Sequence, residues 1–188
     1  MLRRPKGYVG TDHEQIGAAF VAIQRILKMP DQVLGAVDAA KLAAVDPNAW
    51  YPVSWMVELM DKLDANVGRY GLVQMGRTLF KTAHEERARH GARSARDTLY
   101  GMDGMYHAAN RGRDIGGWKV TLFEPGHAEL EKTTIHHCVM EQGILTGALA
   151  TVGCPVNVTQ LRCFREGADC CVYSVTSSIT DARWCGPA

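Results

Sequence analysis

Three cysteines lie close together near the end of the chain, in the segment CFREGADCC at positions 163 to 171. Thiols at this spacing can form a disulfide, respond to oxidation, bind a soft metal ion or pack as small core residues. Six cysteines among 188 residues is below the density of a disulfide-stapled scaffold. The first residues, MLRRPKGYVGTDHEQ, are basic but lack the apolar stretch of a secretory signal. We therefore expect a cytoplasmic protein with reduced thiols, and a disulfide becomes the minority interpretation.

The residues on both sides of this segment alternate as strands do, from 156 to 164 and from 171 to 176. Gly167 lies at the centre of the turn between them, so we expect a β-hairpin. In that hairpin Cys163 and Cys171 oppose each other, and opposed residues in antiparallel strands lie about 4.5 to 5.5 Å apart. The spacing thus predicts a pair of facing thiols.

Two facing thiolates can share one soft cation, and zinc sites often combine a hairpin with a ligand from a helix end. Cys138, at the start of an expected helix, is the natural third ligand. Cys170 points to the other face of its strand. A redox switch stays open as an alternative, but it requires a low thiol pKa and exposure. For Cys154 and Cys185 we expect small-residue packing and a frayed tail.

The elements that must position these thiols begin with a helical part. Apolar residues recur at helical spacing through Phe20, Ile23 and Leu27, and again from Met56 to Val67. The pattern predicts about five helices before residue 112, over roughly 12–29, 32–45, 56–67, 67–89 and 94–109.

After residue 113 the period changes from that of a helix to that of a strand. A strand is expected from Trp118 to Phe123, ended by Pro125-Gly126, and a second one over 129–136. Helical spacing returns over 138–152, where Gly143 and Gly147 would let the helix lie close against a sheet.

The order of these elements predicts one α+β domain over residues 1–188. A helical bundle (about 12–110) is followed by an antiparallel β-β-α-β-β unit (about 115–178). A length of 188 residues suffices for a sizeable core without cross-links.

The segment from 138 to 175 resembles the 4-vinyl-reductase-type (V4R) sensor domain, the effector-binding module of phenol- and xylene-responsive activators. In that family a Cys opens a Gly-containing helix, and a strand ending in Cys leads through a Gly-containing turn to a further Cys and an aromatic strand. The matching positions are Cys138, Gly143, Gly147, Cys163, Gly167, Cys171 and Val172-Tyr173-Ser174-Val175.

The resemblance implies a structural zinc ion held by Cys138, Cys163 and Cys171. The family's fourth ligand is a Glu on the strand before the second Cys, but this chain has Val158-Thr159-Gln160 there. The alternatives for the fourth ligand are His136, His137, Glu166, Asp169 or a water molecule.

The wider fold group contains haem-nitric-oxide-binding domains and lipid-binding subunits of Golgi-tethering (TRAPP) complexes, and this chain is similar to its small stand-alone bacterial members. The resemblance implies a cavity between helices and sheet that takes a small hydrophobic or aromatic ligand. Side chains suited to line it are Trp50, Tyr51, Trp55, Met56, Met60, Phe80, Tyr100, Met105, Tyr106, Trp118 and Phe123. Such residues are more often plain core, so we expect only some of them at the site. Our binding candidates are Trp50, Tyr51, Trp55, Met56, Tyr106, His107 and Trp118.

Haem is the less favoured cofactor. It requires a fixed axial His or Cys in an apolar cavity, for which His107 is a candidate. The haem-nitric-oxide-binding family also carries a Tyr-x-Ser-x-Arg element for the propionates, and the segment from Tyr173 to Ser177 does not match it. A tetrapyrrole-binding protein or reductase and a lipid-holding adaptor subunit remain alternative functions.

Composition and motifs narrow the partners. The net charge is +1, and no apolar run approaches the length of a membrane span. The basic residues over 81–96 are interrupted by Glu85 and Glu86, so a solvated helix face is favoured over a nucleic-acid surface. No catalytic motif is present, which favours binding over catalysis. We expect a homodimer that binds a small hydrophobic ligand and signals to an unknown output protein.

Overall fold

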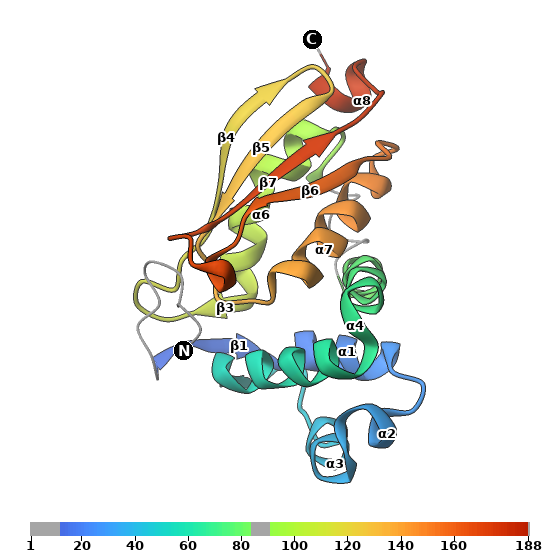
Figure 1. The fold of residues 1–188 in the computed structure, drawn as a ribbon, viewed down its shortest axis with the longest axis vertical. Helices are drawn as coiled ribbons and strands as arrows, with labels where there is room; N and C mark the ends of the chain where they lie inside the picture. Colours follow the sequence, from blue (N-terminus) through green and yellow to red (C-terminus); the bar gives the residue numbers. More distant parts are fainter. Residues whose placement is uncertain (1–11, 84–90, 188) are drawn as a thin grey trace.

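The structure, a computed structural model, describes residues 12–83 and 91–187. The early helices gather at one end of the molecule, and a four-stranded sheet lies at the other with α6 and α7 packed against it (Figure 1). The α-helices are α1 (Gly17–Ile26), α2 (Pro30–Leu34), α3 (Ala36–Ala43), α4 (Val53–Ala83), α6 (Ala95–Ala109), α7 (Cys138–Thr151) and α8 (Ala182–Cys185). The predicted α+β fold is confirmed.

The larger sheet has the order β4-β5-β7-β6 and is antiparallel throughout. Its strands are β4 (Trp118–Glu124), β5 (His127–Lys132), β6 (Asn157–Arg162) and β7 (Cys171–Thr176). A small sheet of order β2-β1-β3 joins β1 (Glu14–Ile16) to β2 (Trp50–Pro52) and β3 (Asn110–Arg111). Because β3 follows α6 directly, this small sheet brings the start of the described chain to the end of α6.

The sheet half follows the predicted order β-β-α-β-β, with one shifted boundary. Gly126 adopts a positive φ of 75° in the expected turn after β4. The second strand was expected over 129–136 but runs over His127–Lys132, and the residues that follow it lead directly into α7. Alternate residues of β5 are buried, among them Lys132.

The helical half differs more from the prediction. The helix expected over 32–45 is divided into α2 and α3 at Gly35, which has a φ of 83°. The two helices expected on either side of Val67 are one element, α4, kinked at Gly68 with a φ of 66°. Residues 84–90, most of which belong to the helix expected over 67–89, lie outside the described residues.

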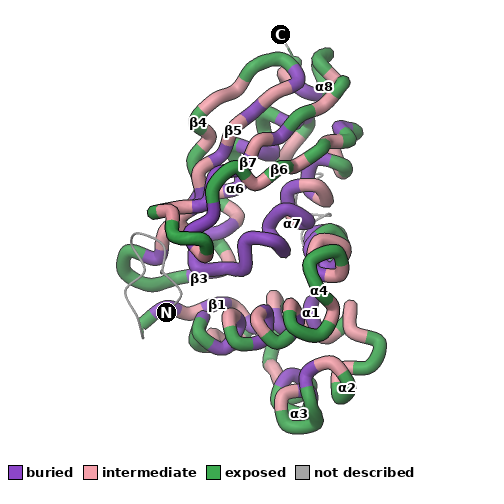
Figure 2. The backbone as a smooth tube through the Cα atoms, in the orientation of Figure 1, coloured by how far each residue is buried: buried purple, intermediate pink, exposed green. Residues whose placement is uncertain are grey.

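Helix α7 packs against α4, which corrects the prediction that its glycines face a sheet. A Cβ atom on Gly143 would overlap the Val73 carbonyl oxygen, and one on Gly76 would overlap the Met140 carbonyl oxygen. Glycines on both helices therefore let the two backbones touch. Most of α7 is buried as a result (Figure 2).

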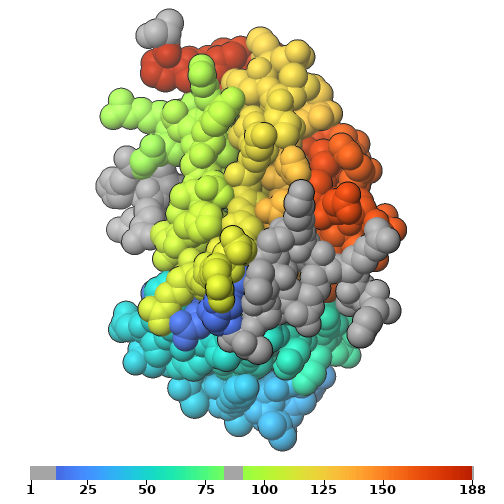
Figure 3. Space-filling view, turned by 90° about the vertical axis from the view of Figure 1, so that its left-hand side faces the viewer, coloured from blue at the N-terminus to red at the C-terminus, as the bar shows by residue number. Residues whose placement is uncertain are grey.

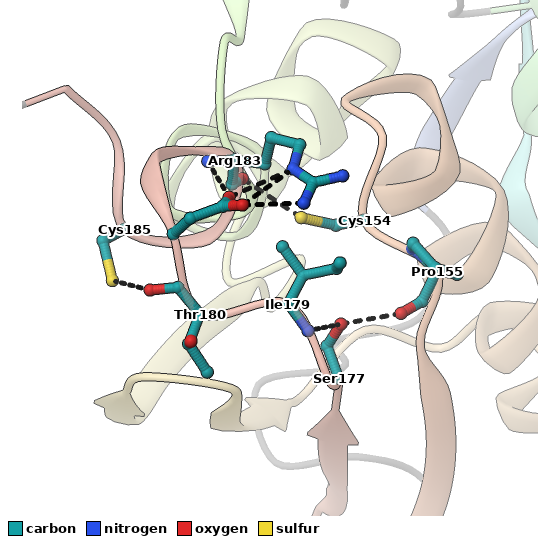
Figure 4. A network of polar contacts seen from close by, with 8 residues as sticks. Cys154, Pro155, Ser177, Ile179, Thr180, Arg183 and Cys185 are labelled. Atoms are coloured by element: carbon teal, nitrogen blue, oxygen red, sulfur yellow. Dashed lines mark hydrogen bonds and ion pairs between the residues drawn. The ribbon is translucent and has the colours of Figure 1, made fainter.

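The C-terminal residues are also better ordered than a frayed tail. The Trp184 side chain in α8 is buried, and its indole N–H donates to the Glu124 carbonyl over 2.7 Å. Cys154 is buried and donates to the Arg183 carbonyl, while Cys185 lies in the same helix and contacts Thr180 (Figure 4). The prediction that Cys154 packs as a small residue is confirmed, and the prediction of a frayed tail is wrong.

Two large apolar clusters fill the interior. One lies between the sheet, α6 and α7, and the other between α1 and α4; Ile144 of α7 packs against both. The two ends are distinct in the space-filling view, with the early helices at the bottom and the sheet above (Figure 3). Within the described residues, no helix has the length and apolar character needed to cross a membrane.

Candidate functional site

Three buried thiols converge where the hairpin meets α7. The Sγ atoms of Cys138, Cys163 and Cys171 all lie within 4.8 Å of one another, and those of Cys138 and Cys163 are 3.3 Å apart. Cys138 is the first residue of α7, Cys163 follows β6, and Cys171 begins β7. The structure thus brings together the three cysteines that the sequence grouped.

Local structure explains this convergence. Arg162 pairs with Val172 across the hairpin, and the same register places Cys163 opposite Cys171. The turn between them contains the 3-10 turn η2 (Phe164–Glu166) and is closed by Gly167, whose φ of 106° favours glycine. On the helix side, the Tyr173 hydroxyl donates to the Cys138 carbonyl over 2.9 Å, which ties α7 to β7.

A buried cation stands beside these thiols. Lys132 pairs with Cys171 across β5 and β7, is 0% exposed, and donates to the His136 carbonyl over 2.5 Å. The hydrogen bond from Cys138 lowers the pKa of Cys171, and the Lys132 charge acts in the same direction. The same hydrogen bond and burial raise the pKa of Cys138, and burial raises that of Cys163.

The donor set suits zinc. Sulfurs bound to one tetrahedral zinc ion at about 2.3 Å lie roughly 3.8 Å from each other, so small side-chain movements would fit all three. Among the described residues, no histidine or carboxylate completes the group. Of the alternatives for a fourth ligand, His137 has its Nε2 3.3 Å from an Asp64 oxygen, and Glu166 and Asp169 are exposed.

The other thiol interpretations lose support. All six cysteines are free. Cys170 faces away from the three-cysteine group, and burial raises its pKa to about 11. Cys171 has a lowered pKa but is buried. Neither thiol combines a low pKa with exposure, as a redox switch would require.

A cavity of about 90 Å³ lies between the early helices and the sheet half. Its wall is mostly apolar and comes from β1, α1, α4, α6, β3, β4 and α7 as well as the β5–α7 connection. The lining residues are Gln15, Ala19, Met60, Leu79, Phe80, Met102, Met105, Tyr106, Ala109, Asn110, Trp118, His136, Met140, Glu141 and Ile144. Apolar walls with a few polar groups are typical of small-molecule sites.

The polar groups in this wall are held by the fold. His136 is buried and its Nε2 lies 3.2 Å from the Gln15 side-chain oxygen. Burial and the charge of Lys132 lower the pKa of His136 to about 3, so the ring is neutral at pH 7. The Asn110 amide donates to the Tyr106 carbonyl, and the Tyr106 hydroxyl donates to the Ile115 carbonyl.

The sequence-based binding candidates divide between the cavity and other places. Tyr106 and Trp118 line the cavity. His107 is largely exposed beside Asp103, with 3.6 Å between its Nε2 and the carboxylate. The remaining four lie elsewhere: Trp50 stacks under Arg111, Tyr51 and Trp55 pack around Phe20, and Met56 is core.

Several residues that line the cavity were not among the sequence-based candidates, notably Asn110, Met102 and Glu141. For Glu141 a signal did exist, because a carboxylate followed by Gln142 interrupts an otherwise apolar helix. Its burial raises its pKa, with Lys132 acting in the opposite direction. Asn110 gave no such signal, because its place in the wall depends on the pairing of β3 with β1.

Comparison with known proteins finds likeness in structure alone. No family model matches the sequence, and no curated protein matches it significantly. An H-NOX protein from S. oneidensis, crystallised in the Fe(II) ligation state, superimposes with a TM-score of 0.69 at 12% identity, covering 90% of this chain and 99% of that one. The chain has the H-NOX fold.

Other H-NOX structures also superimpose on this chain. The Fe(II) unliganded protein from K. algicida gives a TM-score of 0.62 at 10% identity, covering 87% of this chain and 96% of that one. A point mutant of the H-NOX protein from T. tengcongensis gives 0.62 at 12% identity, covering 88% and 97%. The solved structures to which this fold is similar are thus H-NOX domains.

The residues present do not fit haem in this conformation. Ligand sites for larger molecules occupy roughly 300 to 1,000 Å³, whereas this cavity measures about 90 Å³. Four methionines, Phe80 and Trp118 line this small cavity. His107 is exposed and does not line the cavity, and the Nε2 of His136 lies 3.2 Å from the Gln15 side-chain oxygen.

Proposed function

We propose that this chain is a small-molecule sensor domain that binds a compact hydrophobic ligand in the cavity between its helices and its sheet. The observation that carries the proposal is the cavity itself, which has an apolar wall with a few buried polar groups. It lies where α4, α6 and α7 meet, so a bound ligand contacts both ends of the fold. Ligand binding would therefore change how the two ends pack.

A zinc ion held by Cys138, Cys163 and Cys171 is the second part of this proposal. The converging sulfurs support it, as does the resemblance of this segment to the V4R domain. When bound, zinc would link the hairpin to the start of α7. Its role is structural, because the three-cysteine group and the cavity are built from different side chains.

The expected output is a protein–protein signal. We propose that the domain acts as a homodimer and passes the change in packing to an output protein. Measuring the molecular mass of the purified protein in solution tests whether it is a dimer. Comparing the proteins that it captures with and without ligand tests for an output protein.

Thermal unfolding and native mass spectrometry with a set of small aromatic and aliphatic compounds test the proposal. A ligand at a hundred times its Kd stabilises by about 2.7 kcal/mol, which for a protein of this size raises Tm by roughly 5 to 10 °C. We expect at least one compound to bind one per chain with such a shift. If none binds, the sensor proposal fails.

Haem binding is the second candidate, favoured by the H-NOX structures that superimpose on this chain. The S. oneidensis protein is described in the Fe(II)NO ligation state and the K. algicida protein as Fe(II) unliganded, whereas the cavity here is small. Purified protein and protein mixed with haemin can be examined by visible absorption. A Soret band that follows protein concentration would support this candidate, and its absence in both samples would remove it.

A further inference from the structure

Two polar groups in the cavity wall, Asn110 and His136, each leave a hydrogen-bond acceptor without a partner. Asn110 is 3% exposed, uses its amide N–H on the Tyr106 carbonyl, and leaves its buried Oδ1 without a partner. His136 is 5% exposed and leaves its Nδ1 without a partner. Its Nε2 faces the Gln15 oxygen, so that nitrogen carries the proton and Nδ1 presents a lone pair.

Glu141 adds a carboxyl group, whose oxygens accept hydrogen bonds. Burial raises the pKa of this carboxyl, and an ammonium ion beside it would favour the ionised form. The Glu141 side chain lines the same cavity from α7 and is 6% exposed. Among the described residues, none donates a hydrogen bond to its carboxylate. A buried acceptor without a donor costs about 1 to 3 kcal/mol, and more when it is charged. Two buried acceptor atoms without a donor, Asn110 Oδ1 and His136 Nδ1, and a carboxyl group in the same small cavity indicate that a donor belongs there.

We propose that the ligand is a small primary amine, bound as its ammonium ion. An ammonium group has three N–H donors and no acceptor, which matches Asn110 Oδ1, His136 Nδ1 and the Glu141 carboxylate. This inference rests on the proposed function, because it names the ligand of that cavity. A volume of about 90 Å³ limits the amine to a short alkyl chain.

The rest of the wall suits such an ion. Phe80, Tyr106 and Trp118 offer aromatic rings, which attract cations. Met60 and Met102 offer apolar surface for the alkyl part. An anion would meet the Glu141 carboxylate and two further acceptors, so the wall discriminates against carboxylates.

Lys132 is the charge that opposes this proposal, and its surroundings reduce the effect. Its Nζ donates to the His136 carbonyl, and Lys132 pairs with Cys171 across the two strands, although its charge also acts on Glu141. If the proposed zinc ion is bound, its three thiolates would leave a net negative charge on the site, which would offset the Lys132 ammonium. The Glu141 carboxylate then remains available to the ligand.

The test is a titration at pH 7 with three compounds of matched size: n-propylammonium, n-propanol and propionate. Calorimetry gives each Kd. We expect n-propylammonium to bind at least about tenfold more tightly than n-propanol, because hydrogen bonds to charged groups are worth about 1.5 to 3 kcal/mol. Propionate should not bind.

The matched variants are Glu141→Gln, which keeps the side-chain size and removes the charge, and Glu58→Gln on the exposed face of α4. Glu141→Gln should weaken n-propylammonium about tenfold and leave n-propanol within about twofold. Glu58→Gln should change neither. If Glu141→Gln does not fold, the three-compound series on the unmodified protein decides alone.

The outcomes separate this inference from the proposed function. If n-propanol or another neutral compound binds as tightly as the amine, the inference is overturned and the sensor proposal stands. If no compound binds because the acceptors are satisfied by water alone, both are overturned. Equal loss of amine binding in Glu58→Gln would also overturn the inference.

Discussion

The three-cysteine group and the cavity are both buried and share α7, yet they are built in opposite ways. Cys138 opens α7, and Glu141, three residues later, lines the cavity. The thiol group uses a rare residue type from one hairpin and one helix end. The cavity uses common residues from many elements. A site of chemically distinctive residues can be recognised in sequence, whereas a site of ordinary residues emerges only from the packing.

The largest expected effect comes from removing one thiol. Cys163→Ser should reduce zinc from one per chain to none and lower stability by several kcal/mol, because a structural zinc site contributes directly to folding. Metal analysis and thermal unfolding measure both. Cys170→Ser is the matched control, since Cys170 is outside the group, and it should keep the metal. Full zinc in Cys163→Ser would show that the thiol group is ordinary core.

The shared helix gives the next effect. Gly143→Ala should lower the free energy of unfolding by about 1 to 3 kcal/mol, because its Cβ would overlap the α4 backbone. Because α7 carries residues of both sites, zinc affinity and ligand affinity should fall together. Gly101→Ala, on α6 with open space around it, should be neutral or stabilise by up to about 1 kcal/mol. Loss of one affinity alone would mean that α7 does not couple the sites.

Removing the buried cation tests whether the thiol group is charged. Lys132→Met should weaken zinc binding by about 10- to 100-fold, the usual effect of changing a group beside metal ligands. Competition with a chelator measures this. Lys119→Met on the exposed side of β4 is the control and should leave zinc affinity unchanged. An unchanged affinity in Lys132→Met would remove the role given to its charge.

The smallest effect concerns the cavity wall. Tyr106→Phe keeps the aromatic ring but loses the hydrogen bond to the Ile115 carbonyl, so stability should fall by about 1 kcal/mol. Ligand affinity should stay within about twofold, because the hydroxyl is already used. Tyr100→Phe, on an exposed ring, should change neither. A large loss of ligand affinity in Tyr106→Phe would make the hydroxyl a ligand contact.

The same contrast explains what the sequence could predict. The hairpin, α7 and the three-cysteine group follow from short-range patterns, since alternation, Gly167 and cysteine spacing are local. The contact of Gly143 with α4 depends on neighbours far away in sequence. Trp50 and Trp55 looked like site residues because aromatic side chains serve binding and core packing equally well. Nothing in the sequence around Asn110 indicates either a binding residue or a core residue.

Methionine-methyl NMR tests the central claim, that the cavity binds a small ligand, most directly. Met60, Met102, Met105 and Met140 line the cavity, whereas Met56 is core and Met29 is exposed. On titration with a compound that raises Tm, the four lining methyl signals should shift together and saturate at one ligand per chain, with Met56 and Met29 unchanged. Saturating binding that leaves the four lining signals in place would contradict the account.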